Sequence, residues 1–220
     1  MKSVLVIGMS RFGRCLAEKL QELGNEIMII DKNAEKIERL ASDFPDSQIG
    51  DCTDSEVIEA LGVDDFDLVF VTVHEDFEAS LVITSLLKKF GAPRVVAVAD
   101  HEIQNEILHK IGADEVIDPD REISEKLAVR YNSKNIFDYI PLTTEYAIYE
   151  IPILPEWVGH TVVDIDVRRK YNVNIVAIRN GENFRAMPGA SYAFSEGDSV
   201  VVIGKSADVF SLTAKSQGVL

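Results

Sequence analysis

The sequence lacks several features that would place it in a specialised class of protein. Its two cysteines, Cys15 and Cys52, are too few for a disulfide framework, and their spacing matches no metal-binding motif. The apolar run at residues 4–8 is shorter than the hydrophobic region of a signal peptide, and no run approaches the roughly 18 residues that span a bilayer. We therefore expect a cytoplasmic protein without a transmembrane helix.

Basic residues are scarce throughout the chain. There are 22 Lys and Arg residues against 37 Asp and Glu residues, which gives a formal net charge of −15. Residues 1–135 carry 15 basic and 27 acidic residues, and residues 136–220 carry 7 and 10, so both parts are acidic. Because negative charge is repelled by nucleic-acid phosphates and by anionic lipids, we expect no nucleic-acid partner and no direct lipid binding.

The first 118 residues alternate short runs rich in Val and Ile with segments whose apolar residues have helical spacing. The short runs are apolar almost throughout, which is typical of strands buried on both faces of a parallel sheet. They lie at residues 3–7, 26–30, 47–50, 67–73, 94–99 and 115–117. This alternation predicts an α/β fold, a Rossmann-like doubly wound parallel sheet with right-handed crossovers.

The pattern changes after Pro119. Four of the seven prolines fall in the last 85 residues, and Asn180-Gly181 is a hairpin turn signal. We expect helices over 120–134, 162–170 and 206–215 and strands over 146–153, 173–179 and 199–204. The sequence therefore predicts two domains, a nucleotide-binding domain at 1–135 and a small α+β lobe at 136–220.

A glycine-rich loop follows the first expected strand and opens a helix, as a dinucleotide fingerprint requires. The loop is Gly8-Met9-Ser10-Arg11-Phe12-Gly13. Gly8 allows a sharp turn, Gly13 allows close packing of helix and strand, and the helix N-terminus attracts phosphate. Asp31 ends the second expected strand and is placed to accept hydrogen bonds from ribose hydroxyls.

Two residues of this loop leave alternatives open. Ser10 stands where glycine usually admits the pyrophosphate, so its Cβ would push the ligand outward, although its hydroxyl can donate a hydrogen bond. The Arg11 guanidinium either binds a terminal phosphate through two hydrogen bonds or is an ordinary solvated side chain.

A second motif, Gly50-Asp51-Cys52-Thr53-Asp54, ends the third expected strand. In one interpretation the turn covers the adenine edge, with Asp51 or Thr53 hydrogen-bonded to the base. In the other it is a simple turn in which Thr53 or Asp54 caps the next helix. We interpret Cys52 as a small residue at the edge of the core rather than a reactive thiol.

The histidines offer weak support for catalysis. His74 follows the fourth expected strand at the mouth of the crevice, where a dehydrogenase would place its general acid or base. No partner residues or substrate domain accompany it, and His101, His109 and His160 have no metal-binding spacing. An NAD(P)-dependent oxidoreductase stays the alternative function. A redox sensor acting on transcription is disfavoured by the acidic charge and the lack of a helix-turn-helix pattern.

Taken together, the motifs resemble those of RCK-domain (TrkA/KtrA-like) regulatory subunits of Ktr/Trk-type potassium uptake systems. The resemblance covers nearly the whole chain. It is carried by Arg11-Phe12-Gly13, Asp31, Gly50-Asp51-x-Thr53, Lys110-Ile111-Gly112-Ala113-Asp114 with Pro119, and the stretch at 163–171. The implied fold is an N-terminal RCK domain followed by a C-terminal RCK domain.

The resemblance also implies a function without catalysis. The N-terminal domain would bind ATP or ADP, with NAD(H) as an alternative, and would thereby control potassium uptake. The expected binding residues are Gly8, Ser10, Arg11, Phe12, Gly13, Asp31, Asp51, Cys52, Thr53 and His74. Dimers would assemble into a homo-octameric ring on a membrane potassium transporter, so the protein would lie at the inner face of the cell membrane.

Further ligands follow from the same resemblance. Arg11 would contact the terminal phosphates, and Asp120 would bind a divalent cation at a dimer interface. Val98 stands where relatives often have a basic residue. In the C-terminal domain, Ile165, Arg169, Ile175 and Pro188 would contact cyclic di-AMP, unless this lobe serves only to dimerise.

Overall fold

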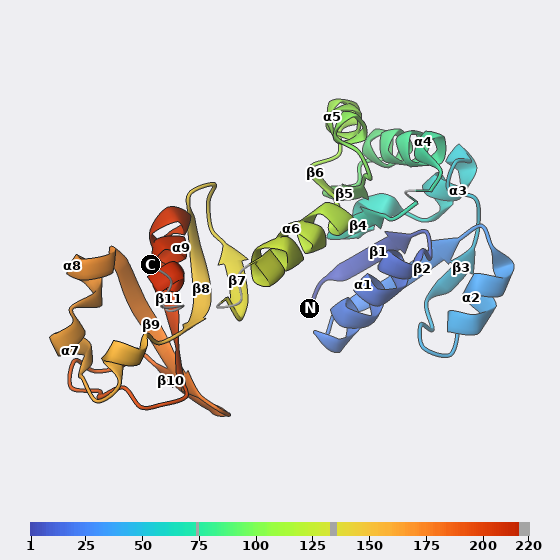
Figure 1. Ribbon diagram of the computed structural model, residues 1–220. Coiled ribbons are helices and arrows are strands. Elements are labelled where there is room, and N and C mark those ends of the chain that lie inside the picture. The colour runs from blue at the N-terminus through green and yellow to red at the C-terminus, as the bar shows by residue number, and fades with distance from the viewer. Residues whose placement is uncertain (74, 133–135, 216–220) are drawn as a thin grey trace. The chain divides into compact units, whose positions relative to one another are not determined.

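The computed structural model describes residues 1–73, 75–132 and 136–215 (Figure 1). The chain divides into two compact units, Met1–Arg121 and Glu122–Leu220. Helix α6 (Pro119–Asn132) contains the point of division. The domain boundary expected between residues 135 and 136 adjoins residues 133–135, which lie outside the description, and it stays a prediction.

The first unit is built on a six-stranded parallel sheet with the strand order β3-β2-β1-β4-β5-β6. The strands are β1 (Ser3–Ile7), β2 (Glu26–Asp31), β3 (Ser47–Ile49), β4 (Leu68–Val71), β5 (Val95–Val98) and β6 (Glu115–Ile117). The connecting helices are α1 (Arg11–Glu22), α2 (Ala34–Leu40), α3 (Ser55–Ala60), α4 (Phe77–Lys89) and α5 (Glu102–Ile111), with a short 3-10 turn, η1 (Val63–Asp65). The order reverses between β1 and β4, so the predicted doubly wound sheet is confirmed, with its switch point at the carboxyl end of β1.

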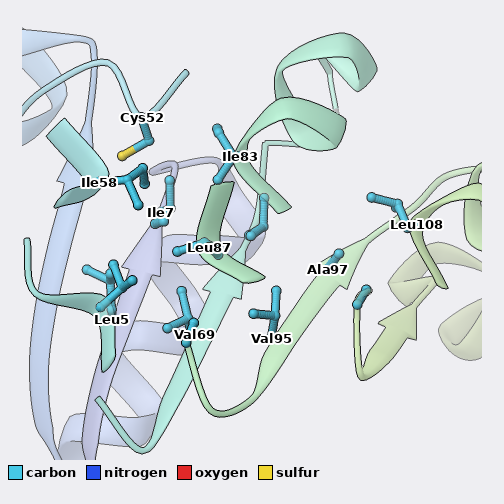
Figure 2. Packing of buried hydrophobic residues seen from close by; sticks show 14 of the residues in the cluster. Leu5, Ile7, Cys52, Ile58, Val69, Ile83, Leu87, Val95, Ala97 and Leu108 are labelled. Carbon is cyan, nitrogen blue, oxygen red and sulfur yellow. The ribbon is translucent and has the colours of Figure 1, made fainter. Parts of the chain in front are cut away.

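Both faces of this sheet are buried along its central strands. Side chains alternate along β1, so that Leu5 and Ile7 pack with residues of α3 and α4 while Val4 and Val6 pack with residues of α1 and α2. Figure 2 shows the first of these cores, where Ile58, Ile83 and Leu87 lie over the sheet. A strand covered on both sides must be apolar at every position, which is the pattern that the sequence displays.

The second unit is an α+β lobe, as predicted. Its sheet is antiparallel in the order β10-β9-β11-β8-β7. The strands are β7 (Asp138–Pro141), β8 (Tyr146–Pro152), β9 (Val173–Asn180), β10 (Asn183–Ala186) and β11 (Asp198–Lys205). The helices are α7 (Val162–Ile165), α8 (Val167–Tyr171) and α9 (Ser206–Lys215), with a 3-10 turn, η2 (Pro155–Trp157). The lobe packs around Trp157, Tyr149 and Phe194.

The lobe differs from the sequence expectation in three places. The short strands β7 and β10 were not predicted, although β10 follows the Asn180-Gly181 turn that was. The helix expected over 162–170 is interrupted at Asp166, whose φ of 47° lies in the left-handed region. This conformation lets α7 and α8 point in different directions.

Helix α6 exposes most of its apolar side chains. Ile123, Leu127 and Tyr131 are 58%, 42% and 76% exposed. None of its described residues is buried. Among the described residues, no helix is both long and apolar enough to cross a membrane.

Candidate functional site

A cavity of about 320 Å³ opens at the carboxyl ends of the strands around the switch point. Several predicted residues line it, namely Gly8, Ser10, Asp31, Asp51, Cys52 and Thr53. Arg11, Phe12 and Gly13 lie in the first turn of α1 and are not among the lining residues, and Arg11 is exposed. His74 lies outside the described residues.

The glycine loop has the tight geometry that its motif predicts. Gly8 has a φ of +92°, and a Cβ at this position would lie 2.5 Å from Cγ2 of Val73. A Cβ on Gly13 would collide with Oγ1 of Thr72, whose single hydroxyl proton is shared between the carbonyl oxygens of Ile7 and Gly8. Both glycines are therefore needed to bring α1 and β4 close to the end of β1.

Ser10 caps helix α1. Its Oγ accepts a hydrogen bond from the backbone N–H of Gly13 at 3.1 Å. The cap orients the start of a 12-residue helix beside the cavity, where its partial positive charge favours an anion. The serine that replaces the usual glycine thus has a structural role of its own.

Asp31 is 8% exposed and connects two loops. Its Oδ2 accepts a hydrogen bond from the N–H of Met9 at 2.6 Å, and its Oδ1 accepts one from the N–H of Asn33 at 2.8 Å. Lys36 Nζ lies 3.4 Å from Oδ2. The residue expected to bind ribose therefore also ties the glycine loop to the turn before α2.

Asp51 and Thr53 are joined to each other. Oδ1 of Asp51 accepts hydrogen bonds from the Thr53 N–H at 3.0 Å and from the Thr53 hydroxyl at 2.7 Å. These two bonds lower the pKa of Asp51, so its carboxylate is charged at neutral pH. Asp54, rather than Thr53, caps α3. Among the described residues, no donor forms a hydrogen bond with Oδ2 of Asp51. Of the two residues considered for the adenine edge, Asp51 is the better acceptor.

Family models match both units, a TrkA-N domain over residues 4–119 and a TrkA-C domain over residues 146–215. The chain belongs to the TrkA-N/TrkA-C family. It is 35% identical to Ktr system potassium uptake protein C of Bacillus subtilis (strain 168), over 94% of each chain. It is 30% identical to Ktr system potassium uptake protein A of the same organism, also over 94% of each chain.

Solved structures agree with the TrkA-N/TrkA-C fold. The GsuK channel matches with a TM-score of 0.70 and 18% identity over 96% of this chain and 38% of that one. The GsuK channel bound to NAD matches with a TM-score of 0.65 and 18% identity, over the same shares of the two chains. At this identity the likeness establishes the RCK fold. Nothing in these relatives or in the described site favours the oxidoreductase alternative.

Cys52 is a packing residue of the TrkA-N domain, as predicted. It is 3% exposed and belongs to the core that contains Ile30 and Ile58 (Figure 2). Burial raises the pKa of its thiol to about 12, so the thiolate that would react is not populated at neutral pH.

Sequence reasoning missed five polar residues that line the cavity, namely Lys32, Lys36, Thr72, Glu75 and Asp76. Lys32 Nζ lies 3.7 Å from Oδ2 of Asp76. The proximity of the two lysines to Asp31 in the sequence could have identified them as residues of the cavity. Thr72 and Asp76 reach the site only because β4 lies beside β1 in the sheet.

The TrkA-C domain has a cavity of about 490 Å³, and three of the four residues expected to contact cyclic di-AMP line it. Arg169, Ile175 and Pro188 line this cavity, but Ile165 is 7% exposed and packs in the core of the lobe. The Arg169 guanidinium Nε lies 3.8 Å from Oδ2 of Asp166.

The remaining expected positions lie outside the two cavities. Asp120 is exposed in the first turn of α6, and the described residues contain no group of three His, Cys, Asp or Glu side chains that could hold a metal ion. Val98 is 2% exposed at the end of β5.

Proposed function

We propose that this protein is a nucleotide-sensing regulatory subunit of a potassium uptake system, with no catalytic turnover of its own. The observation that carries the proposal is the cavity at the switch point, where Ser10, Asp31 and Asp51 converge from the ends of three neighbouring strands. Its relatives in Bacillus subtilis are named as potassium uptake proteins, which supports the transport role.

The cavity's chemistry suits an adenine nucleotide. The Asp51 carboxylate would accept a hydrogen bond from the adenine amino group. Asp31 would accept from the ribose, and the start of α1 would receive the first phosphates. The ligand would be ATP or ADP, with NAD(H) as the competitor; GsuK has been solved with NAD and with ADP.

Arg11 would distinguish the phosphates. It is exposed in the first turn of α1 and is not among the lining residues of the cavity, and a terminal phosphate that extends from the site would meet it there. A guanidinium gains most from the additional charge of ATP. Nucleotide exchange would then favour one of two conformations of a homo-octameric ring of dimers, and the ring would transmit this shift to a membrane transporter subunit.

Two further ligands belong to the same proposal. Asp120 would contribute to a divalent-cation site completed by a second protomer. Cyclic di-AMP would bind the cavity of the TrkA-C domain through Arg169, Ile175 and Pro188. The protein would be cytoplasmic and would associate with the inner face of the membrane through its transporter partner.

The proposal is tested by isothermal titration calorimetry of the purified protein with ATP, ADP, NAD⁺, NADH and cyclic di-AMP. We expect at least one adenine nucleotide to bind the TrkA-N domain, with a modest preference for ATP over ADP. Arg11→Ala should remove the preference and leave ADP affinity nearly unchanged. Equal loss of both nucleotides would assign Arg11 to loop structure, and no binding of any nucleotide by the unaltered protein would refute the proposal.

A further inference from the structure

One ion pair joins two loops across the nucleotide cavity. Lys32 follows β2, and Asp76 lies between β4 and α4. In the strand order β2 and β4 lie on opposite sides of β1. Lys32 Nζ and Asp76 Oδ2 are 3.7 Å apart, and both residues line the cavity. The pair therefore spans the carboxyl end of β1, where Ile7 and Gly8 also line the cavity.

The two ends of the pair are held unequally. Asp76 is fixed, because its Oδ1 accepts a hydrogen bond from the N–H of Ala79 at 3.0 Å and so caps α4. The Lys32 side chain is 59% exposed and has a long flexible stem. Lys32 is therefore the part that can swing away while Asp76 stays in place.

Electrostatic attraction also favours a position of the Lys32 ammonium group over the cavity. Its charge attracts Asp51, on the turn after β3, as well as Asp76. Lys36 is already paired with Asp31 at 3.4 Å. Lys32 is thus paired with Asp76, and a second carboxylate, that of Asp51, lines the same cavity from another loop.

We propose that Lys32 and Asp76 form a strap over the cavity, which a nucleotide must part on entry and on exit. This inference rests on the proposed function, since it concerns the same ligand. Half-exposed ion pairs are weak, so the strap slows exchange without blocking it. It sets how quickly the subunit follows a change in nucleotide, while the ligand contacts set affinity.

The strap can be separated from simple charge effects by a pair of substitutions. Lys32→Met alone removes a positive charge and should weaken binding of an anionic nucleotide, whereas Asp76→Asn alone removes a negative charge and should strengthen it. The double variant Lys32→Met/Asp76→Asn keeps the net charge and removes only the link. Asparagine retains the oxygen that caps α4, and Lys32→Met/Asp76→Ser provides a second version with a different cap.

Association and dissociation rates of ADP, ATP and NADH would be measured by surface plasmon resonance on the full chain. For the double variant we expect both rates to rise about two- to fivefold, with Kd within twofold of the parent value. A matched control is Arg94→Met/Glu115→Gln, which removes a 2.8 Å ion pair at the amino ends of β5 and β6 and should change neither rate.

The outcomes separate the two hypotheses. Unchanged rates in both double variants at Lys32 and Asp76, with normal binding, would overturn the strap and leave the proposed function intact. A changed Kd with only one altered rate would also overturn it, because a strap acts on entry and exit alike. Failure of the unaltered protein to bind any of the three nucleotides would refute the proposed function and the strap together.

Discussion

Among the described residues each unit buries one aspartate carboxylate, and the two are held differently. Asp198 in the TrkA-C domain accepts hydrogen bonds from the Asn180 amide at 2.6 Å and from the Tyr192 hydroxyl and the Ser195 N–H at 2.9 Å each. Asp31 in the TrkA-N domain accepts two backbone hydrogen bonds, but its third neighbour is the half-exposed Lys36. A carboxylate whose donors are all fixed is structural, whereas one with a displaceable donor beside a cavity can receive a ligand.

Asp198→Ala should have the largest effect on stability. It removes the acceptor for three donors, and buried groups left unpaired are costly, so we expect a loss of about 3 kcal/mol. Native-state hydrogen exchange at β9 and β11 would measure it, and nucleotide affinity should be unchanged. A loss of nucleotide binding would remove the contrast with Asp31.

Asp31→Ala should affect both properties. The glycine loop loses its tie to the turn before α2, which we expect to lower the free energy of unfolding by about 1–2 kcal/mol. Nucleotide affinity should fall about 10- to 100-fold, as expected for a lost hydrogen bond to a charged group. Calorimetry that shows unchanged affinity would assign Asp31 to structure alone, like Asp198.

The comparison of how buried polar groups are hydrogen-bonded extends to Thr84 on α4. Its Oγ1 is buried without a hydrogen-bond partner among the described residues, as is the Ser80 Oγ one turn earlier. Thr84→Val keeps the shape and removes the unpaired hydroxyl, so it should raise the free energy of unfolding by about 1 kcal/mol. Thr84→Ala is the control, since the space it leaves should lower stability instead. Urea denaturation measures both.

The smallest expected effect concerns pH. The hydrogen bonds from Thr53 hold the folded pKa of Asp51 below its unfolded value of about 3.9. Stability from this interaction is therefore present above that pH and is lost as the pH falls through the lower folded value. Thr53→Val should destabilise the protein at pH 7 by less than about 1 kcal/mol, since Asp51 is exposed. The difference should vanish in acid; a difference that persists there would exclude Asp51 as its source.

Most of the parallel sheet could be predicted because strands buried on both faces leave an unmistakable apolar run. The short edge strands β7 and β10 could not, because at least one face of each is exposed and their sequences carry little hydrophobic pattern. The break at Asp166 was also missed, since a left-handed aspartate has no signal as clear as glycine.

The candidate site divides in the same way. Ser10, Asp31 and Asp51 belong to continuous motifs and were found from spacing. Lys32 and Asp76 are 44 positions apart in the sequence and meet only because the sheet places β2 and β4 on either side of β1. Interactions of this kind depend on strand order, which a motif does not contain.

The position of the one tryptophan has a practical consequence. Trp157 is 1% exposed and packs against Tyr171 and Phe194 in the TrkA-C domain, while the TrkA-N domain has no tryptophan. Indole fluorescence therefore reports on one half of the molecule alone. Excitation at the red edge of indole absorption therefore follows the unfolding of the TrkA-C domain. Circular dichroism follows the unfolding of both domains, so a difference between the two unfolding curves reports the unfolding of the TrkA-N domain without a label.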